Sequence, residues 1–552
     1  MLTGCPLGEV AAEIARAPDM AIKTEIKLLL DAHAMRRVAR LPEVRAARRG
    51  RADTRRLRAI HFDTPAADLG RAGAVLQARE EGVRWIQTLK LEDRVAGGLH
   101  VWEWPLAGPT LDLSVLRGNG AARVFRDAKI RKALTGVCQS DFIRTSIALE
   151  LGGGARAELR LDSGELIAGK RHAPISEIEI EMLDGDRARL FDFAIALAET
   201  LRVQVSNSNL AARGYATLLG ISVEPVKAQP PALAEAMQMQ DAFGEIVRSC
   251  LAQMQANETG AGTGRNLEFL HQYRVGLRRL RSAFGLFRPL LASECTAALM
   301  QEMRWLGAYL GAARDWDVFC EQTLNPMWQR VGRDPALAAL RRRCARERSA
   351  CAAAARDAIG SPRYAKFVLR LGRLLATQDG FPNAPPLKAF AAARLQKRDR
   401  SLRKIARTLD ASDPAQVHGM RIAVKKLRYS AEFLQSLFPQ QEARDHAQAL
   451  ARLQDVLGGV NDSTTGLRLL DSLPRDRSKA GAYARGQVRE WLAARAESNL
   501  GTLHGRWDEL RSQKRYWKSA LPPRARQSKP TGKSGGCSAD METLQGAFAE
   551  AE

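Results

Sequence analysis

The pattern of apolar and polar residues changes once along this chain, near residue 220. Before that point, short runs alternate between the two kinds of residue and end at Gly, Asp or Pro, which is typical of antiparallel strands. These runs cover 22–28, 74–80, 84–92, 99–106, 144–151, 155–162 and 176–183. A longer amphipathic stretch at 187–201 predicts a helix after the last strand. From about residue 233 onward, the pattern is helical and rich in Ala, Leu and Arg.

These patterns predict an α+β multidomain protein, in which an N-terminal domain of antiparallel strands, for which a β-barrel is one arrangement, precedes an all-α helical-bundle domain. A chain of 552 residues is long enough for two or more hydrophobic cores. The segment EPVKAQPPA reads as a linker, because closely spaced prolines continue neither a helix nor a strand. The expected organisation is an N-terminal extension (1–19), a strand domain (20–222), a linker (223–236), a helical domain (237–515) and a polar, disordered tail (519–552).

Two segments of the helical region repeat the same arrangement of basic residues. HQYRVGLRRLR begins at His271, and HGMRIAVKKLR begins 147 positions later at His418. The offsets 0, 3, 7 and 10 fall within an arc of roughly 80° on an α-helix, beside its apolar face. We call these residues the basic stripes: His271, Arg274, Arg278 and Arg281 in the first copy, and His418, Arg421, Lys425 and Arg428 in the second.

The repeat continues downstream of the stripes. LGAARD ends at Asp315 and LGGVND ends at Asp462, again 147 positions apart, which indicates duplicated helical bundles. A single stripe is most often a solvated helix face with a few ion pairs, but two copies in register favour a binding role. Four like charges on one face repel one another unless an anion neutralises them. A long polyanion is therefore the expected partner.

Composition agrees with a polyanionic partner. The net charge of +24 and the pI near 10.1 favour nucleic acid, polyphosphate or an anionic membrane surface. Aromatic residues make up only 6% of the chain, so platforms for base stacking are scarce, and the sequence has no RNP or zinc-finger motif. These observations favour polyphosphate and leave nucleic acid as an alternative.

The sequence contains no run of about 18 apolar residues that would predict a transmembrane helix, and its beginning lacks the pattern of a signal peptide. Its eight cysteines form no C-x-x-C pair and no zinc-binding spacing. We therefore predict a cytoplasmic protein with reduced thiols and no integral membrane segment. If polyphosphate is its partner, polyphosphate granules are where it would associate.

The doubled motif H-x-x-R-x-x-x-(R/K)-(R/K)-L-R, followed by L-G-x-x-x-D, resembles that of the CHAD family, the conserved-histidine α-helical domain. The resemblance covers about 237–515 and implies a pseudo-symmetric helical domain that binds inorganic polyphosphate on a basic surface. It implies phosphate contacts for the eight stripe residues and for the adjacent Arg279 and Lys426. The sequence leaves open whether His271 and His418 touch phosphate or orient their neighbours.

Charged residues gather on one face of the predicted strands. Lys23, Glu25 and Lys27 share a face of the first strand, and Glu177 and Glu179 share a face of the last. Such a face usually points to solvent. The alternative is a closed barrel with a polar lumen, whose apolar outer face packs under helices. Its tunnel would collect these charges: Arg79, Lys90, Glu103, Arg144, Arg160, Glu177, Glu179 and Arg213. Cations there would hold phosphate oxygens, and carboxylates would hold a divalent metal.

The strand order and four short segments resemble the CYTH family of triphosphate tunnel enzymes over about residues 20–220. The segments are HFDTP (61–65), WIQTLK (85–90), SEIEIE (176–181) and ARGY (212–215). The resemblance implies inorganic triphosphatase activity with Mg²⁺ or Mn²⁺. It implies acidic or metal-binding roles for Glu25, Glu103, Glu177 and Glu179, and phosphate-binding roles for Lys27, Arg79, Lys90, Arg144 and Arg213. The predicted catalytic set is Glu25, Lys27, Arg79, Lys90 and Arg213.

Three positions depart from the family pattern. Lys23 stands where the family has the first glutamate of E-x-E-x-K, Gln77 replaces an arginine of L-R-x-R, and Leu210 replaces a lysine. The loss of one donor from a preorganised site costs about 10²–10³ in rate. Three interpretations stay open: a triphosphatase with a polyphosphate-binding domain, a polyphosphate-binding protein with a decayed tunnel, and a nucleic-acid-binding protein.

Overall fold

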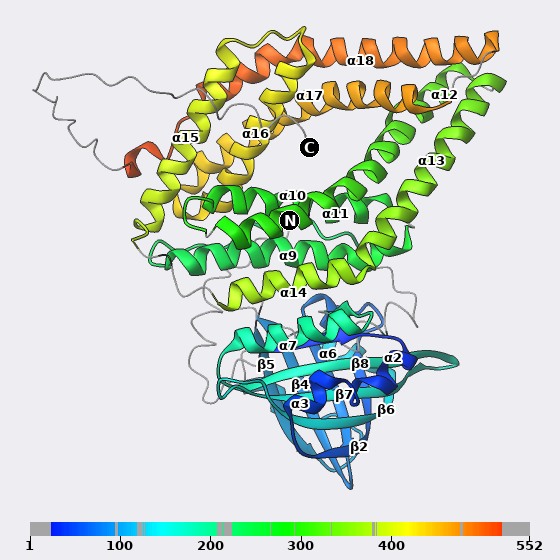
Figure 1. Cartoon of the computed structure of the whole chain (residues 1–552), viewed down its shortest axis with the longest axis vertical. Helices are drawn as coiled ribbons and strands as arrows, with labels where there is room; N and C mark the ends of the chain where they lie inside the picture. Colours follow the sequence, from blue (N-terminus) through cyan, green and yellow to red (C-terminus); the bar gives the residue numbers. More distant parts are fainter. Residues whose placement is uncertain are drawn as a thin grey trace, which may run out of the picture. The chain divides into compact units, whose positions relative to one another are not determined.

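The computed structural model describes residues 24–93, 98–118, 125, 127–206, 214, 224–264, 266–291, 293–332, 334–377, 381, 383–474 and 478–521. The chain divides into two compact units, Met1–Glu224 with Gly360–Thr377, and Pro225–Ile359 with Gln378–Glu552 (Figure 1). The first unit is built on a sheet and the second is helical, which confirms the predicted fold class. The predictions for residues 1–19 and 522–552, and for Lys23, Leu210 and Arg213, lie outside the described residues.

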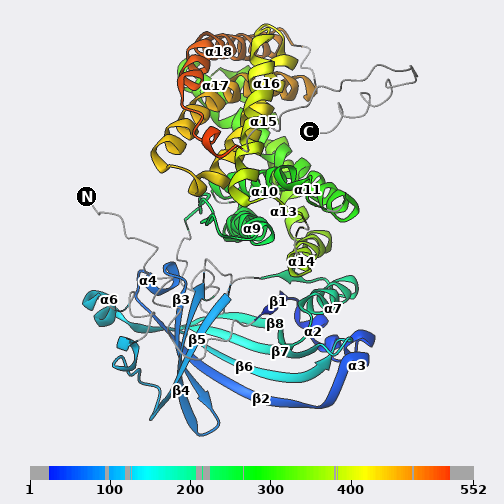
Figure 2. The ribbon, with the colours of Figure 1, turned by 90° about the vertical axis from the view of Figure 1, so that its left-hand side faces the viewer.

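The first unit is built on one nine-stranded sheet in the order β5-β4-β3-β2-β6-β7-β8-β1-β9, in which all neighbouring strands are antiparallel. The strands are β1 (Glu25–Leu29), β2 (Arg48–Asp63), β3 (Ala74–Glu81), β4 (Arg84–Asp93), β5 (Gly98–Leu106), β6 (Thr135–Glu150), β7 (Arg156–Ala168), β8 (Arg171–Asp184) and β9 (Gln204–Val205). The sheet curls strongly (Figure 2), but among the described residues no ladder joins the edge strands β5 and β9. Within the described residues, the predicted closed barrel is therefore an open, curled sheet.

Helices cover the apolar face of this sheet. They are α2 (Ala32–Val38), α3 (Pro42–Ala47) and α7 (Arg187–Thr200). The shorter α4 (Asp68–Arg71), η1 (Val115–Gly118) and α6 (Ala128–Ala133) pack on the same face at β3 and β4. Alternation along β1 places Ile26 and Leu28 in one core with residues of α2, α3 and α7. Asp31 and Asp186 fix the starts of α2 and α7, because each carboxylate accepts a hydrogen bond from a free backbone N–H of the first turn.

One helix from the second half of the chain belongs to the first unit. It is α14 (Pro362–Ala376), whose Ala365 and Leu369 complete the core beneath α7. Gly372 allows the close approach, because a Cβ there would lie 2.2 Å from the ring of Phe191. Arg373 also pairs with Asp192 of α7. The helical pattern of residues 237–515 gave no sign that this segment leaves the helical unit.

The helical unit consists of two copies of a four-helix arrangement. Its helices are α9 (Met239–Thr263), α10 (Leu267–Phe287), α11 (Ser293–Phe319), η3 (Cys320–Leu324), α12 (Asn325–Val331), α13 (Pro335–Ile359), α15 (Leu387–Arg407), α16 (Pro414–Leu434), η4 (Gln435–Leu437), α17 (Gln440–Ser472), α18 (Lys479–Ser512) and η5 (Lys518–Ala520). Helices α10 and α16 begin and end 147 residues apart, as the repeat predicts. Within the described chain, no helix is long and apolar enough to cross a membrane.

Candidate functional site

The charged face of the strands points into the curl of the sheet. Glu177, Glu179 and Glu181 are only 2%, 6% and 4% exposed, although their strand β8 alternates them with core isoleucines. The isoleucines lie under the helices, so the glutamates occupy the opposite, concave face. Strand pairing sets Lys27 opposite Glu179 and Glu25 opposite Glu181. The charged face of these strands is thus buried in the lumen of the curled sheet and does not point to solvent.

Glu179 lies at the centre of this lumen. Its carboxylate is 3.5 Å from Lys27 Nζ, 3.0 Å from Arg144 Nη2 and 3.8 Å from Arg160 Nη1. Burial by itself would raise the pKa of Glu179, but the surrounding cations, Lys27 and Arg144 foremost, outweigh burial and hold the pKa below its usual range. Glu179 is therefore ionised and is the shared counter-charge of cations from three strands.

Glu25 completes the acidic centre. Burial and the neighbouring charge of Glu179 raise the pKa of Glu25, and a side-chain hydrogen bond between the two carboxyl groups contributes in the same direction. Two carboxyl groups that share a proton are a pair that a divalent cation can bridge instead. Of the four predicted metal ligands, the structure thus brings Glu25 and Glu179 together.

The other two predicted metal ligands are placed differently. Glu103 on β5 pairs with Arg79 at 3.3 Å, and Glu177 lies on β8 two residues from Glu179. Among the described residues, no group of three or more His, Cys, Asp or Glu side chains has the geometry of a metal site. A cation at Glu25 and Glu179 would need phosphate oxygens and water to complete its coordination, which is the manner in which proteins usually hold Mg²⁺. The donor set fits a metal that arrives with, or is shared by, a phosphate ligand.

Lys90 faces the same centre from the far side of the sheet. Strand β4 is five strand spacings from β8, about 24 Å in a flat sheet. Nevertheless Lys90 interacts electrostatically with Glu179, Lys27 and Glu25. Burial lowers the pKa of Lys90, and Glu179 opposes that effect. The curl of the sheet is therefore what assembles Lys27, Lys90 and Arg144 around one space.

One departure from the family pattern can be placed. Gln77 pairs with His61 of β2 and Thr88 of β4, two residues before Arg79, and so lies on the lumen face of β3. It points a neutral amide where the family pattern has a guanidinium.

Sequence reasoning missed Asp162. Its carboxylate is fully buried and accepts two hydrogen bonds from Arg144, at 2.8 and 2.6 Å, which orients that guanidinium toward Glu179. Two residues along β7 from Arg160, Asp162 shares its face, so the alternation that singled out Arg160 extends to it.

His61 gives the lumen a pH dependence. It is 3% exposed and 3.1 Å from Ser140 Oγ, and burial with a contribution from Lys90 lowers its pKa to about 4. The unfolded chain, with a His pKa of about 6.5, binds more protons between these values. Stability should therefore be lost as the pH falls from about 6.5 to 4, by up to about 3 kcal/mol.

A His61→Gln variant should lose most of this pH dependence, because glutamine hydrogen bonds to Ser140 but takes no proton. Hydrogen–deuterium exchange of β2 and β6 between pH 7 and 4 measures the effect. His172→Gln is the matched control, because His172 is largely exposed beside Glu165. An unchanged pH slope in His61→Gln would contradict the assignment.

The basic stripes of the helical unit meet across its two copies. Arg274 on α10 interacts electrostatically with Arg278, Arg421 of α16 and Arg314 of α11. Burial, and then the repulsion of these cations, lowers the pKa of Arg274, and only Asp315 opposes them among its main partners. The two downstream aspartates also meet, because Asp462 contributes to a raised pKa of Asp315, after burial. Cations from both copies thus gather around Arg274, which is the situation expected of an anion site.

The two stripe histidines have different surroundings. His418 Nδ1 lies 3.1 Å from Asn461 Oδ1 on α17, so its ring is oriented by the neighbouring helix. The pKa of His271 is lowered to about 4, first by burial and then by Arg314, so this histidine is neutral at pH 7. Both rings are half-buried rather than displayed on the surface.

Arg278 is tied to the other copy. Its Nε donates a hydrogen bond to the Tyr429 hydroxyl, and its guanidinium lies 5.5 Å from the centre of that ring. The two stripes therefore lie next to one another in the described structure, rather than on separate sides of the unit.

The assignment of Arg279 as a phosphate ligand is wrong. Arg279 is 0% exposed, its Nε lies 3.1 Å from Glu432, and it donates hydrogen bonds to Gln253 and to the backbone of Gln229. Its charge is already neutralised inside the bundle. Its counterpart Lys426 is exposed and remains a candidate.

Arg314 is a cation of this site that the sequence reasoning passed over. It influences both His271 and Arg274, and it precedes Asp315 in the repeated segment, which lies within α11. The signal was present in LGAARD, where a basic residue stands at the position of Asn461 in LGGVND.

Comparison with known proteins agrees with both halves of this description. A model of the CYTH domain matches residues 21–215, and a model of the CHAD domain matches residues 245–471. An inorganic triphosphatase of Haemophilus influenzae is 29% identical over 170 residues, which are 29% of this chain and 45% of that protein. The chain thus matches less than half of this relative's length.

Two solved structures are similar to separate parts of the chain. The CHAD domain from the plant Ricinus communis is 34% identical, over 53% of this chain and 98% of that one, with a TM-score of 0.47. A putative adenylyl cyclase from Hippeastrum, described as having a dominant triphosphatase activity, is 18% identical over 35% of this chain and 96% of that one, with a TM-score of 0.25. Both domain models match in the order that the motifs predict, so this chain carries a CYTH domain followed by a CHAD domain.

Proposed function

We propose that the helical unit binds inorganic polyphosphate through the basic stripes, and that the sheet unit binds inorganic triphosphate in its lumen and hydrolyses it. The observation that carries the proposal is the lumen itself. Lys27, Arg144 and Arg160 surround a single central carboxylate, Glu179, on a face removed from solvent. Cations so placed hold phosphate oxygens strongly, because bulk water does not screen them.

The roles within the lumen follow from these positions. Arg144, held by Asp162, would present its fork to phosphate oxygens, and Lys27 and Lys90 would add point charges from opposite sides. Glu25 and Glu179 would hold Mg²⁺ or Mn²⁺ together with the phosphate ligand. A bound divalent ion supplies neutralisation of the terminal phosphoryl group and helps to position water.

A second candidate is a lumen that binds phosphate without turning it over. The position of Gln77 on the lumen face favours it, because one guanidinium of the family pattern is missing there. The helical unit would then provide the function, as a polyphosphate-binding protein at granules.

Phosphate release from tripolyphosphate by the full chain, with Mg²⁺ and then with Mn²⁺, tests the proposal. We expect metal-dependent release that Glu25→Gln abolishes. Binding of tripolyphosphate without release would support the second candidate. A third candidate, nucleic-acid binding, would be supported if RNA displaced polyphosphate at matched salt.

The substitution Gln77→Arg should increase the affinity of the lumen for tripolyphosphate. A new charge-assisted hydrogen bond contributes about 1.5–3 kcal/mol, so tripolyphosphate affinity should rise about 10- to 150-fold, as measured by isothermal titration calorimetry. Val83→Arg is the matched control, because residue 83 is 99% exposed in the turn between β3 and β4. Equal gains in the two variants would show that net charge alone is responsible.

A further inference from the structure

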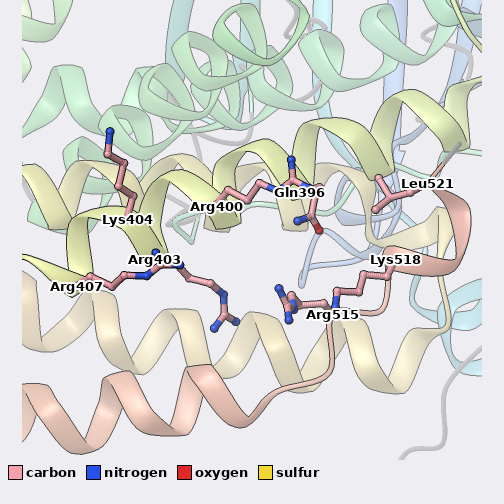
Figure 3. Close-up of a pocket in the computed structure, with 8 residues that line it drawn as sticks. All are labelled: Gln396, Arg400, Arg403, Lys404, Arg407, Arg515, Lys518 and Leu521. Atoms are coloured by element: carbon pink, nitrogen blue, oxygen red, sulfur yellow. The ribbon is translucent and has the colours of Figure 1, made fainter. Parts of the chain in front are cut away.

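A second basic site lies on the helical unit, away from the motif that defines the stripes. It is a pocket of about 650 Å³ between α15 and the C-terminal segment that follows α18 (Figure 3). Its volume is in the range of ordinary ligand sites. Its lining is unusual in charge, because six of its eight residues are cations: Arg400, Arg403, Lys404, Arg407, Arg515 and Lys518.

The cations are arranged by the fold. The four on α15 lie within an arc of roughly 100° on one side of the helix. Trp517, fully buried, donates a hydrogen bond to Gln396 of α15 at 3.0 Å, which holds the C-terminal segment against that helix. This contact carries Arg515 and Lys518 into the same pocket (Figure 3).

One buried carboxylate organises the two facing guanidinium groups. Asp399, 2% exposed, accepts hydrogen bonds from Arg403 at 2.9 and 3.0 Å and lies 3.8 Å from Arg515. Arg403 and Arg515 reach toward one another from opposite sides of the pocket (Figure 3). The carboxylates of the described residues form no ion pair with the other four cations: Arg400, Lys404, Arg407 and Lys518.

The internal repeat shows that the bundle itself does not require these charges. At the equivalent positions of the first copy, 147 residues earlier, the chain has Gln253, Ala256, Asn257 and Gly260. Asn257 is buried there and hydrogen bonds to the backbone N–H and C=O of Val226, so the preceding segment covers that side of α9. In the second copy the same side of the helix lines a basic pocket instead.

We propose that this pocket is an additional anion site that takes a run of contiguous phosphates, separate from both the stripes and the lumen. Six cations against one buried carboxylate leave a charge surplus that a single small anion does not neutralise. Guanidinium groups from two sides match the closely spaced oxygens of linked phosphates. Among the described residues that line the pocket, none has an aromatic ring to stack a base.

Two sources offer this chemistry: a short free oligophosphate, or a segment of a long polyphosphate chain. The test titrates the full chain in EDTA with tripolyphosphate and, separately, with long-chain polyphosphate. The variant is Arg400→Gln, Lys404→Gln and Arg407→Gln together, which changes exposed side chains only. The matched control removes the same charge from other exposed positions of the unit, as Arg342→Gln, Arg346→Gln and Lys479→Gln.

Loss of one tripolyphosphate site in the variant, but not in the control, would identify a free oligophosphate. An unchanged number of tripolyphosphate sites, with long-chain affinity at least ten-fold weaker than in the control, would identify a chain segment. Identical behaviour of variant and control would overturn the proposal. The proposal would also be overturned if single-stranded RNA with the same number of phosphates competed for this site as effectively as polyphosphate. The basic stripes and the lumen are unchanged in the wild type, the variant and the control. If the proposed function were wrong, all three proteins would therefore show it equally, whereas a failure of this proposal concerns only the difference between variant and control.

Discussion

Replacing Glu179 by glutamine is expected to destabilise the sheet unit by about 3 kcal/mol. The substitution keeps the size of the side chain but removes the charge that Lys27, Arg144 and Arg160 share inside the lumen. Removal of one partner from a buried ion pair usually costs about 3–5 kcal/mol. We expect a loss at the lower end of this range, because two of the three cations keep another partner: Asp162 still pairs with Arg144, and Glu158 still pairs with Arg160. Hydrogen–deuterium exchange of β1 and β8 measures the loss.

The same variant should bind tripolyphosphate more tightly in metal-free buffer, because the ligand then supplies the missing negative charge without repulsion from Glu179. Bound ligand stabilises the folded state by mass action, so tripolyphosphate should restore more stability to the variant than it adds to the wild type. With Mg²⁺ present, phosphate release should fall. These opposite signs separate a phosphate-binding lumen from a purely structural ion-pair cluster, in which added tripolyphosphate would rescue nothing.

Glu158→Gln is the matched control. Glu158 is 29% exposed and pairs with Arg160, two residues further along the same strand, β7. Its replacement should cost at most about 1 kcal/mol, since partly exposed pairs contribute little. A loss as large as that of Glu179→Gln would show that Glu179 is not the centre of the cluster.

The double variant Arg274→Gln and Arg421→Gln should lose polyphosphate binding without losing stability. Each charge-assisted hydrogen bond contributes about 1.5–3 kcal/mol, so the dissociation constant should rise about 100-fold or more. Stability should stay constant or increase, because burial and then Arg278 and Arg421 already disfavour the charge of Arg274. Polyphosphate titration together with thermal unfolding in ligand-free buffer measures both effects.

Arg279→Gln should show the reverse behaviour and serves as the comparison. Arg279 is fully buried and paired with Glu432, so its loss should destabilise the helical unit by about 3–5 kcal/mol. The affinity of the remaining folded protein for polyphosphate should be unchanged. If Arg274 and Arg421 behaved like Arg279, the stripes would be a packing feature, and polyphosphate binding would have to be sought elsewhere.

Most of the helices and strands could be predicted from the local periodicity of apolar residues. The alternation of apolar and polar residues with a period of two located seven of the nine strands. The 147-residue repeat correctly indicated that α10 and α16 begin and end 147 residues apart. Strand β2 was missed because RRGRADTRRLR has no apolar alternation. Pairing with β3 and β6 on its two sides makes it a strand. Likewise, the sequence of α14 resembles that of the other helices, and only its packing against α7 shows that it belongs to the first unit.

The candidate site, too, was determined partly by the sequence and partly by the tertiary structure. The sequence by itself determined which charges share a strand face or a helix stripe, because side-chain direction follows from local backbone geometry. Only the tertiary structure decided which face is inside, that β4 and β8 approach across the curl, and that Arg279 is buried while Arg278 beside it contacts Tyr429. Burial and charge balance depend on what packs against a residue, and those neighbours come from distant parts of the chain.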